Sequence, residues 1–407
     1  MNIVIAGGGV AGVTAAETAR KTNPKADITV FSAERDLLYF RPRLPEIVSG
    51  KLPLEKIFAH PAGWYQEQRL EMRLGENLVE VCPDTRVVRG SMGSRLVYDR
   101  LLVATGADSS TPPPVDYKLP GVFTLRRLQD AQSLYYEASR CRAAVLMGAG
   151  LLAMEIGAAL GAMGLTVHVL ERAGRILPRQ TTPASSAKLN KHLTDQGLVF
   201  HLNSSLKAAA GHERLSAVEL SDGTRIDAQI LVVAAGVTPN LTLANAMKLK
   251  VDRGIVADEY LETSTPGVYA AGDCAQTADG FGGLWTIGRA EGLVAGHNVA
   301  CEPAERKKYV AVPPSSTLKV AGLDLVAAGN IDPDDKLTGA VFEDEKAYRK
   351  VVVDDDGLVV GYTNLGTTRG NRELAGALGR KRLPPDVLRD LSATLDFDFA
   401  RVQNIAG

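Results

Sequence analysis

Two glycine-rich segments have the residue types and the spacing that bind the pyrophosphate of a dinucleotide. The first follows an apolar stretch from Ile3 to Ala6 and reads GGGVAG over residues 7–12. In this G-x-G-x-x-G pattern Gly7 permits a tight turn, Gly9 lets the backbone approach the phosphates, and Gly12 lets the following helix pack against the strand. The free N–H groups and the dipole at the start of that helix favour an anion.

A carboxylate follows the first glycine segment at a position suited to a ribose. The pattern predicts a helix that ends near Asn23 and Pro24, and then a second strand from Ile28 to Phe31. Glu34 lies just beyond this strand and is the candidate acceptor for ribose hydroxyls. The glycine pattern alone also occurs by chance, but here it has the strand, turn and helix context that dinucleotide binding requires.

The same pattern recurs farther along the chain. Residues 148–153 read GAGLLA, after an apolar strand from Ala143 to Met147 and before a helix expected to end near Met163. Ala153 replaces the third glycine, a position that needs only a small side chain. Two such units indicate two bound dinucleotides.

Glu171 ends the next expected strand, Thr166 to Leu170, and lies 18 residues after Ala153. The carboxylate that accepts from an adenosine ribose is expected about 20 residues after the glycines. Since a carboxylate there repels a 2′-phosphate, NADH is favoured over NADPH. The nearby Arg172 and Arg175 weaken this inference, and an alternative is that all three residues form only a solvated turn.

The composition limits the class of protein. A chain of 407 residues is too long for one compact core, so two or three domains are expected. A formal net charge of −1 argues against nucleic acid as the main partner. The four cysteines form no C-x-x-C pattern and the six histidines form no H-E-x-x-H pattern, which predicts reduced thiols and no bound metal.

The sequence also predicts a cytoplasmic protein with no membrane partner. The N-terminus reads as a buried strand and lacks the basic start and long apolar region of a signal peptide. Residues 143–170 are apolar enough to resemble a membrane span. However, Gly148 and Gly150 divide this stretch into a strand and a helix, and Glu155 would place a charge near the bilayer centre.

Three further segments carry a family resemblance. Residues 98–107 read YDRLLVATGA, residues 235–240 read AGVTPN, and residues 269–275 read YAAGDCA. In this order, and with the two glycine segments, they resemble the two-dinucleotide-binding flavoprotein reductases of the pyridine nucleotide-disulfide oxidoreductase superfamily over about residues 1–300. The resemblance implies FAD in the first nucleotide domain, NADH in the second, and chain crossings between these domains at the first two segments.

The resemblance also implies roles for two carboxylates. Asp273 would accept a hydrogen bond from the ribityl chain of the flavin, although aspartate after a strand also suits a helix N-cap. Glu155 would lie beside the nicotinamide and the flavin as the catalytic residue. The alternative for Glu155 is a solvated carboxylate on a helix.

The segment LYFRPRLPE, residues 38–46, narrows the resemblance. Disulfide reductases of the superfamily have a C-x-x-x-x-C pair just after the first nucleotide unit, and related peroxidases, oxidases and coenzyme A disulfide reductases have one cysteine there. This chain has none, so a covalent disulfide relay is excluded and electrons must leave the flavin directly. The R-P-x-L-P-E pattern is most similar to NADH:rubredoxin oxidoreductases, with oxygenase-type ferredoxin reductases second. Pro45 and Glu46 stand where ferredoxin reductases often have a lysine.

The expected fold class is α/β, with two Rossmann-type dinucleotide-binding domains for FAD and NAD and a small C-terminal α+β cap domain. The FAD domain is expected over residues 1–108 and 235–308, the NAD domain over residues 109–234, and the cap over residues 309–407. Residues 215–233 read as strands around a turn at Asp222 and Gly223. The cap shows strand signals at 317–325, 347–353 and 358–363, a turn at Asp356 and Gly357, and two helices.

The leading functional expectation is an FAD-dependent enzyme that passes electrons from NADH to a small redox protein, with rubredoxin the first candidate. The alternatives are a ferredoxin reductase, the flavin component of a nitrite-reducing system, an NADH oxidase, and a non-enzymatic FAD/NADH redox sensor. An acidic partner is expected because residues 366–383 carry five cations and one carboxylate, and Arg41 and Arg43 come from the flavin-proximal loop. Alternatively, the five cations, Arg369, Arg372, Arg380, Lys381 and Arg382, cap helix ends and solvate the surface.

Glu155 is the expected catalytic residue. The expected cofactor-binding residues are Gly7, Gly9, Val10, Ala11, Gly12, Ser32, Glu34, Arg41, Pro42, Ala104, Thr105, Gly106, Gly148, Gly150, Leu151, Leu152, Glu155, Glu171, Arg172, Gly236, Gly272, Asp273, Trp285 and Thr286.

Overall fold

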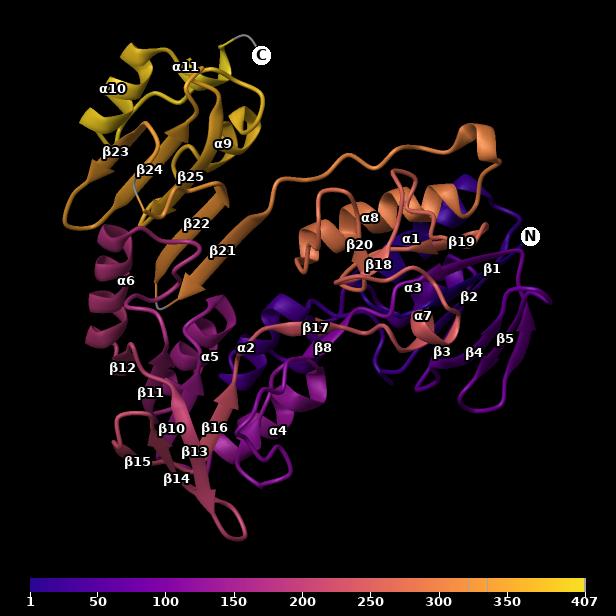
Figure 1. Cartoon of the computed structure of the whole chain (residues 1–407), viewed down its shortest axis with the longest axis horizontal. Coiled ribbons are helices and arrows are strands. Elements are labelled where there is room, and N and C mark those ends of the chain that lie inside the picture. Colours follow the sequence, from indigo (N-terminus) through magenta and orange to yellow (C-terminus); the bar gives the residue numbers. More distant parts are fainter. Residues whose placement is uncertain (321, 335, 406–407) are drawn as a thin grey trace. The chain divides into compact units, whose positions relative to one another are not determined.

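The computed structural model describes residues 1–320, 322–334 and 336–405, and it contains two compact units. Unit 1 comprises Met1–Arg43, Leu52–Ser110 and Gly236–Val312. Unit 2 comprises Leu44–Lys51, Thr111–Ala235 and the described residues from Pro313 onward. Both units are therefore assembled from segments that lie far apart in the sequence (Figure 1).

Unit 1 is built on a parallel sheet with the strand order β19-β7-β1-β2-β3. Side chains alternate across a strand, so Ile3 and Ile5 of β1 enter one apolar core while Val4 and Ala6 enter the core on the other face. Burial on both faces is typical of a parallel sheet and explains the continuous apolar run at the N-terminus. The strands are β1 (Asn2–Ala6), β2 (Asp27–Ser32), β3 (Leu70–Leu74), β7 (Arg100–Val103) and β19 (Val268–Ala270).

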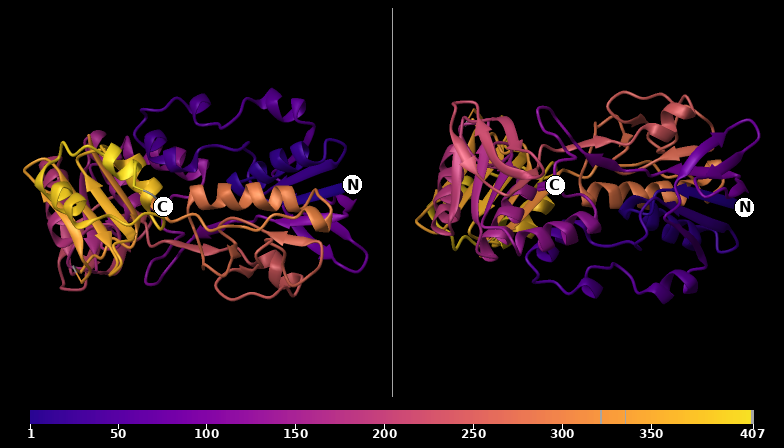
Figure 2. Two further views of the ribbon diagram at one scale, coloured as in Figure 1. Left: turned by 90° about the horizontal axis from the view of Figure 1, so that it is seen from above. Right: turned by 90° about the horizontal axis from the view of Figure 1, so that it is seen from below.

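Two helices, α1 (Val10–Thr22) and α8 (Trp285–Asn298), pack against each other and line the core that contains Ile3 and Ile5. In both views of Figure 2, α8 (orange) lies between the purple segment 52–67 and the salmon segment 240–265. The other elements of unit 1 are α3 (Ala62–Glu67), α7 (Thr242–Ala246), β4 (Leu78–Cys82), β5 (Val87–Gly90), β6 (Arg95–Val97), β8 (Ala107–Ser109), β17 (Val237–Pro239), β18 (Ile255–Val256), β20 (Ala275–Gln276), and the 3-10 helices η1 (Arg41–Arg43), η2 (Leu54–Lys56) and η3 (Pro303–Glu305).

Unit 2 contains a second parallel sheet, with the order β12-β11-β10-β16-β9. The strands are β9 (Val122–Phe123), β10 (Ala143–Met147), β11 (Thr166–Glu171), β12 (Leu198–Leu202) and β16 (Ile230–Val233). β10 is central, and its residues Ala144, Val145 and Leu146 are completely buried. The helices of this part are α2 (Leu44–Val48), α4 (Leu128–Ala138), α5 (Leu151–Ala162) and α6 (Pro183–Asp195).

A three-stranded antiparallel sheet accompanies the second parallel sheet. It consists of β13 (Leu206–Gly211), β14 (Leu215–Leu220) and β15 (Arg225–Asp227). The expected turn at Asp222 and Gly223 joins β14 to β15, and Gly223 has a φ of 87° that favours glycine. Residues 215–233 thus form β14, β15 and β16, in agreement with the prediction of strands around this turn.

The C-terminal part of unit 2 is an antiparallel sheet with the order β21-β22-β25-β24-β23. Figure 1 shows the C-terminal helices gathered beside β23, β24 and β25. We expected two helices, but the described residues of this part contain three, and β23 lies outside the three expected strand segments. The elements are β21 (Ser315–Val320), β22 (Leu323–Gly329), β23 (Gly339–Glu343), β24 (Tyr348–Val353), β25 (Val359–Leu365), α9 (Asn371–Ala377), α10 (Pro385–Ala393) and α11 (Ala400–Gln403).

Among residues 1–320, 322–334 and 336–405, no helix combines the length and the hydropathy that a membrane span requires. Over the same residues, no group of three or more histidine, cysteine, aspartate or glutamate side chains could hold a metal ion.

Candidate functional site

The first glycine segment forms a tight turn between β1 and α1. Gly7 has a φ of 130°, and a side chain there would collide with the carbonyl oxygen of Ala104. A side chain at Gly12 would collide with the carbonyl oxygen of Gly7. Gly9 differs from both, because a Cβ there would meet nothing within 4 Å. Protein atoms therefore pack tightly against Gly7 and Gly12, and the space beside Gly9 is empty. Helix α1 begins there with Val10 and Ala11, so the turn fits a dinucleotide pyrophosphate.

The end of β2 lies beside this turn. A Cβ on Gly8 would lie 2.7 Å from the Ser32 Cβ, so Ser32 sits directly against the glycine segment. Glu34 accepts hydrogen bonds from the Tyr39 hydroxyl at 2.6 Å and from Arg41 Nη2 at 2.8 Å. The carboxylate and the guanidinium, expected separately as cofactor-binding groups, are thus paired with each other. Pro42, in η1, follows Arg41.

The A-T-G segment and Gly236 lie where the chain passes between the two units. β8 and β17 pair in antiparallel fashion just after these segments. The Thr105 hydroxyl donates to the Asn240 carbonyl at 2.8 Å, and the Asn240 N–H donates to the Gly106 carbonyl at 2.9 Å. Gly106 and Gly236 have φ angles of 69° and 93°, which favour glycine. The structure therefore ties the two crossings together, and Ala104 continues β7 into the first of them.

Gly272 and Asp273 follow β19 in unit 1. Gly272 has a φ of 81°, which forms a turn after β19. A Cβ on Gly272 would lie 2.8 Å from the Ala11 Cβ, so this turn lies against the start of α1. The expected cofactor residues Trp285 and Thr286 form the first turn of α8, and the Trp285 ring lies 5.6 Å from the Phe40 ring between centroids.

Sequence reasoning missed Glu291, whose Oε2 accepts the Gly272 N–H at 2.6 Å. Its position on a helix 18 residues after Asp273 gave no local signal.

The second glycine segment repeats this geometry in unit 2. Gly148 has a φ of 110°, and a Cβ there would lie 2.8 Å from the Ala234 carbonyl oxygen. A Cβ on Gly150 would meet nothing within 4 Å, and Ala153 is completely buried. The helix α5 starts with Leu151 and Leu152. This turn is also open only at its middle glycine, so it fits a second pyrophosphate.

Glu171 ends β11 beside the second turn. Its carboxylate accepts from the Ala149 N–H at 3.0 Å and from the Ala173 N–H at 2.9 Å. Arg172 is exposed, whereas Arg175 donates to the Pro178 carbonyl at 3.4 Å and lies 3.7 Å from Asp334. Arg175 thus lies within ion-pair distance of a carboxylate that is itself half exposed, and the role of Glu171 toward a 2′-phosphate stays a prediction.

Glu155 lies on α5 among charged and polar groups of the same unit. Burial raises the pKa of its carboxyl to about 7, the Glu46 carboxylate of α2 adds to the rise, and a hydrogen bond from the Lys319 N–H of β21 opposes it. Glu46 was noted in the sequence only as a departure from lysine. Its effect on Glu155 was not foreseen, because it depends on the packing of α2 against α5.

The expected residues therefore fall into two sets, one in each unit. Unit 1 brings together the residues from Gly7 to Gly12, Ser32, Asp273 and their neighbours, and unit 2 brings together the residues from Gly148 to Glu155 with Glu171. Each set surrounds an open glycine turn at the carboxyl edge of a parallel sheet, which is where doubly wound folds bind dinucleotides.

Comparison with known proteins agrees with this geometry. Residues 1–300 match the family described as pyridine nucleotide-disulphide oxidoreductase, and residues 314–381 match the rubredoxin NAD+ reductase C-terminal domain. The chain is 31% identical over 383 residues to the assimilatory nitrate reductase electron transfer subunit of Bacillus subtilis (strain 168), which covers 93% of this chain and 49% of the relative. The chain therefore spans about half the length of this curated relative.

Two other similarities extend over nearly the full length of both proteins. The chain is 29% identical over 393 residues to rubredoxin-NAD(+) reductase of Ectopseudomonas oleovorans, covering 93% of this chain and 99% of the relative. The crystal structure of NADH:rubredoxin oxidoreductase from Clostridium acetobutylicum has a TM-score of 0.74 and 25% identity, covering 93% of this chain and 94% of that one.

Proposed function

Because the chain belongs to the pyridine nucleotide-disulphide oxidoreductase family, we propose that it is an FAD-dependent NADH oxidoreductase that passes electrons to a small redox protein, with rubredoxin the leading candidate. FAD would bind the FAD domain, residues 1–108 and 235–308, and NADH would bind residues 109–234. The observation that carries the proposal is the pair of glycine turns, one in each unit, that are closed at their flanking positions and open at Gly9 and Gly150.

The residues of the chain position the cofactors, and the cofactors supply the redox chemistry. When bound, FAD can accept a hydride from the nicotinamide and release electrons one at a time. The N–H groups at the start of α1 and α5 would bind the two pyrophosphates, and Asp273 would accept from the ribityl chain. No cysteine occurs in residues 38–46, so the electrons would pass to the partner without a disulfide intermediate. The four cysteines are free thiols, which is consistent with the cytoplasm as the site of this reaction.

Anaerobic stopped-flow spectroscopy tests the proposal. The purified chain should contain one noncovalent FAD, NADH should bleach it, and purified rubredoxin should restore its colour faster than ferredoxin or oxygen does. A chain that binds one dinucleotide and no flavin would contradict the proposal. Reoxidation by oxygen alone would identify an NADH oxidase instead.

The similarity to the assimilatory nitrate reductase electron transfer subunit supports a second candidate function. That relative is about twice as long as the region that matches, so part of it has no counterpart in this chain. Under this alternative the reduced flavin would pass electrons to a redox protein other than rubredoxin, for which ferredoxin is the probe. The ferredoxin arm of the same stopped-flow experiment distinguishes the two candidates.

We expect a preference for NADH over NADPH of at least about 10-fold in kcat/KM, near 1.4 kcal/mol. The Glu171 carboxylate would repel a 2′-phosphate, and the charge of Arg175 is partly offset by Asp334 at 3.7 Å. In Glu171→Gln the repelling charge is lost, and the single amide oxygen can still accept from one of the two N–H groups, that of Ala149 or that of Ala173, so the preference should shrink. Arg179→Ala, which removes an exposed cation outside the expected cofactor-binding set, is the matched control and should leave the preference near that of the wild type. Equal kcat/KM values for the two coenzymes in the wild type would contradict the assignment.

In the basic segment 366–383, some cations bind other groups of the protein and others are exposed to solvent. Lys381 donates to the carbonyls of Val402, Gln403 and Ile405, and Arg369 forms an ion pair with Asp396 at 2.6 Å. These two cations therefore have structural roles, as the alternative interpretation of the segment predicted. Arg372 and Arg380 are exposed.

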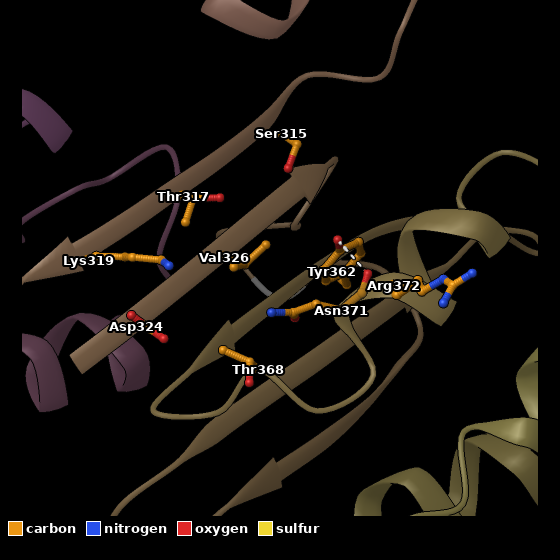
Figure 3. A pocket seen from close by; sticks show the side chains of 9 residues that line it. All are labelled: Ser315, Thr317, Lys319, Asp324, Val326, Tyr362, Thr368, Asn371 and Arg372. Carbon is orange, nitrogen blue, oxygen red and sulfur yellow. Dashed lines mark hydrogen bonds between the residues drawn. The ribbon is translucent and has the colours of Figure 1, made fainter. Parts of the chain in front are cut away.

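Arg372 borders a polar hollow of about 400 Å³ on β21, β22 and β25 (Figure 3). Its lining offers hydroxyl, amide and ammonium groups, one carboxylate, and the apolar surface of Val326 and Tyr362; the other residues are Ser315, Thr317, Lys319, Asp324, Thr368 and Asn371. We propose that this hollow and Arg380 contribute to the docking surface for an acidic redox protein.

Reversing both exposed cations, in Arg372→Glu with Arg380→Glu, should slow partner reduction about 10-fold at low salt, because electrostatic steering raises association rates. The rate for the wild type should fall toward that of the variant as salt rises, since exposed charges are screened within about 8 Å at physiological ionic strength. Flavin reduction by NADH should be unchanged. The matched control, Arg95→Glu with Arg225→Glu, makes the same charge change at other exposed positions. Equal rates for the two double variants would show that the cap is not an electrostatic docking site.

A further inference from the structure

Glu291 is a buried carboxyl group in unit 1 that the proposed redox chemistry does not use. It lies on α8 and is 4% exposed. Its Oε2 accepts a hydrogen bond from the Gly272 N–H at 2.6 Å. A carboxyl group removed from water needs such a partner, because burial of an unpaired polar group is costly.

The Gly272 N–H lies just beyond the end of strand β19, where the backbone leaves the sheet. β19 ends at Ala270, and the Ala271 N–H still donates to the Val103 carbonyl of β7 at 3.1 Å. Gly272 is the next residue and turns away from the sheet in a left-handed conformation, with a φ of 81°. Glu291 supplies the acceptor for this N–H, which would otherwise be a partly buried donor without a protein partner. The residue that follows directly is Asp273.

The position of Glu291 is fixed by close packing of its helix. A Cβ on Gly292, the next residue of α8, would lie 2.5 Å from the Ala11 carbonyl oxygen of α1. The backbones of α8 and α1 therefore approach each other as closely as glycine allows. Ala11 is also the residue against which Gly272 packs. Helix α1, helix α8 and the Gly272 turn thus meet at one point of unit 1.

The groups around Glu291 disfavour its charged form. Burial raises the pKa of Glu291 to about 7, the Asp273 carboxylate adds to the rise, and the Gly272 N–H opposes it. Tyr309 is the other titratable neighbour, since the Glu291 charge contributes to the raised pKa of its hydroxyl. The α1 residues next to Gly292, Ala11 and Thr14, are uncharged.

We propose that Glu291 is a positioning residue for the flavin: its hydrogen bond to Gly272 holds the turn that presents Asp273 to the cofactor. This inference rests on the proposed binding of FAD by unit 1. Under this inference, α8 contributes to FAD binding by holding the Gly272 turn, a contribution that the two glycine segments do not make.

The affinity of the apoprotein for FAD tests this role, measured by titration calorimetry. Glu291→Ala leaves the Gly272 N–H without an acceptor and should weaken FAD binding by about 10-fold or more. Glu291→Gln keeps an acceptor oxygen and should bind FAD within about 3-fold of the wild type. The matched control is Asn298→Ala, which also removes a buried polar side chain from α8. Asn298 donates to the carbonyls of Tyr260 and Lys307, whereas the Gly272 N–H donates to Glu291. The control should lose thermal stability but keep its FAD affinity.

The pH dependence of apoprotein stability gives a second readout that does not require flavin. Because the folded-state pKa lies above the ordinary value of 4.5, the folded form holds this proton more tightly than the unfolded form does. The stabilisation is therefore present at low pH and is lost as the pH rises through about 7. Glu291→Gln, which cannot ionise, should show a smaller fall in Tm across this range.

Several outcomes decide the inference. FAD binding by Glu291→Ala that equals the wild type would overturn it, and so would an equal loss of affinity in Asn298→Ala. An unchanged pH dependence of Tm in Glu291→Gln would also count against it. If the wild-type chain itself binds no FAD, the proposed function fails and this inference fails with it. If only the variant comparison fails, the proposed function stands.

Discussion

Gly9→Val is expected to fold normally and to be purified without flavin. Gly9 has φ −78° and ψ −173°, an extended conformation that valine adopts readily, and a Cβ there meets no protein atom within 4 Å. The valine side chain would instead occupy the space over the N-terminus of α1 that the pyrophosphate needs. Loss of two charge-assisted hydrogen bonds, each about 1.5–3 kcal/mol, predicts FAD binding weaker by at least about 100-fold. Flavin absorbance per chain and circular dichroism measure the two expectations.

Gly12→Val distinguishes a blocked site from a damaged fold. A side chain at Gly12 collides with the Gly7 carbonyl oxygen, so this variant should lose flavin together with folded structure. Gly9→Val should lose only the flavin. Full flavin content in Gly9→Val would mean that the first glycine turn does not bind the cofactor.

The second large effect is expected for Gly150→Val, which should keep its flavin but lose reduction by NADH. Gly150 has φ −79° and ψ 176°, and a Cβ there also meets nothing within 4 Å. The same loss of pyrophosphate contacts predicts that kcat/KM for NADH falls by at least about 100-fold. Anaerobic reduction by NADH measures this fall, and reduction by dithionite, which needs no nucleotide site, serves as the control. If Gly150→Val also lost its flavin, the assignment of one nucleotide to each unit would be wrong.

The parts of the fold that depend on local sequence were predicted well. The α/β fold class and the family resemblance are confirmed by the two parallel sheets and by the family match over residues 1–300. The strand at Ala143–Met147 and the start of a helix at Leu151 agree with β10 and α5. These elements were predictable because glycines separate an apolar strand from a helix of small residues within a few positions.

Interactions between residues that lie far apart in the sequence could not be predicted from it. Glu291 and Gly272 are 19 residues apart, and Arg175 and Asp334 are joined only by the fold of unit 2. Lys381 was interpreted as part of a docking surface, but it binds carbonyls at the C-terminal end of the described chain. Glu291 gave no local signal, and Arg175 and Lys381 could be interpreted as surface residues, because tertiary packing supplied each partner from another element.

The domain limits expected from the sequence stay a prediction. Compact packing divides the chain near residues 110, 235 and 312, and it also places Leu44–Lys51 with unit 2. The placement of Leu44–Lys51 in unit 2 could not be foreseen, because this short segment follows the R-P-R sequence without a change in composition. Its place depends on contacts of α2 with α4 and α5.

Unit 1 cannot be completed during synthesis until the ribosome has passed residue 298. Its sheet needs β19 beside β7, and its first helix, α1, needs α8 as a partner. The whole parallel sheet of unit 2, from β9 to β16, is synthesised in the interval. During that time β7 has one unpaired edge and α1 an uncovered apolar face, the conditions under which nascent chains aggregate. Slow, non-local parallel pairing lengthens this exposure. Because unit 1 is discontinuous, we expect the yield of this protein in cells to depend on chaperones and on the rate of translation between residues 104 and 298.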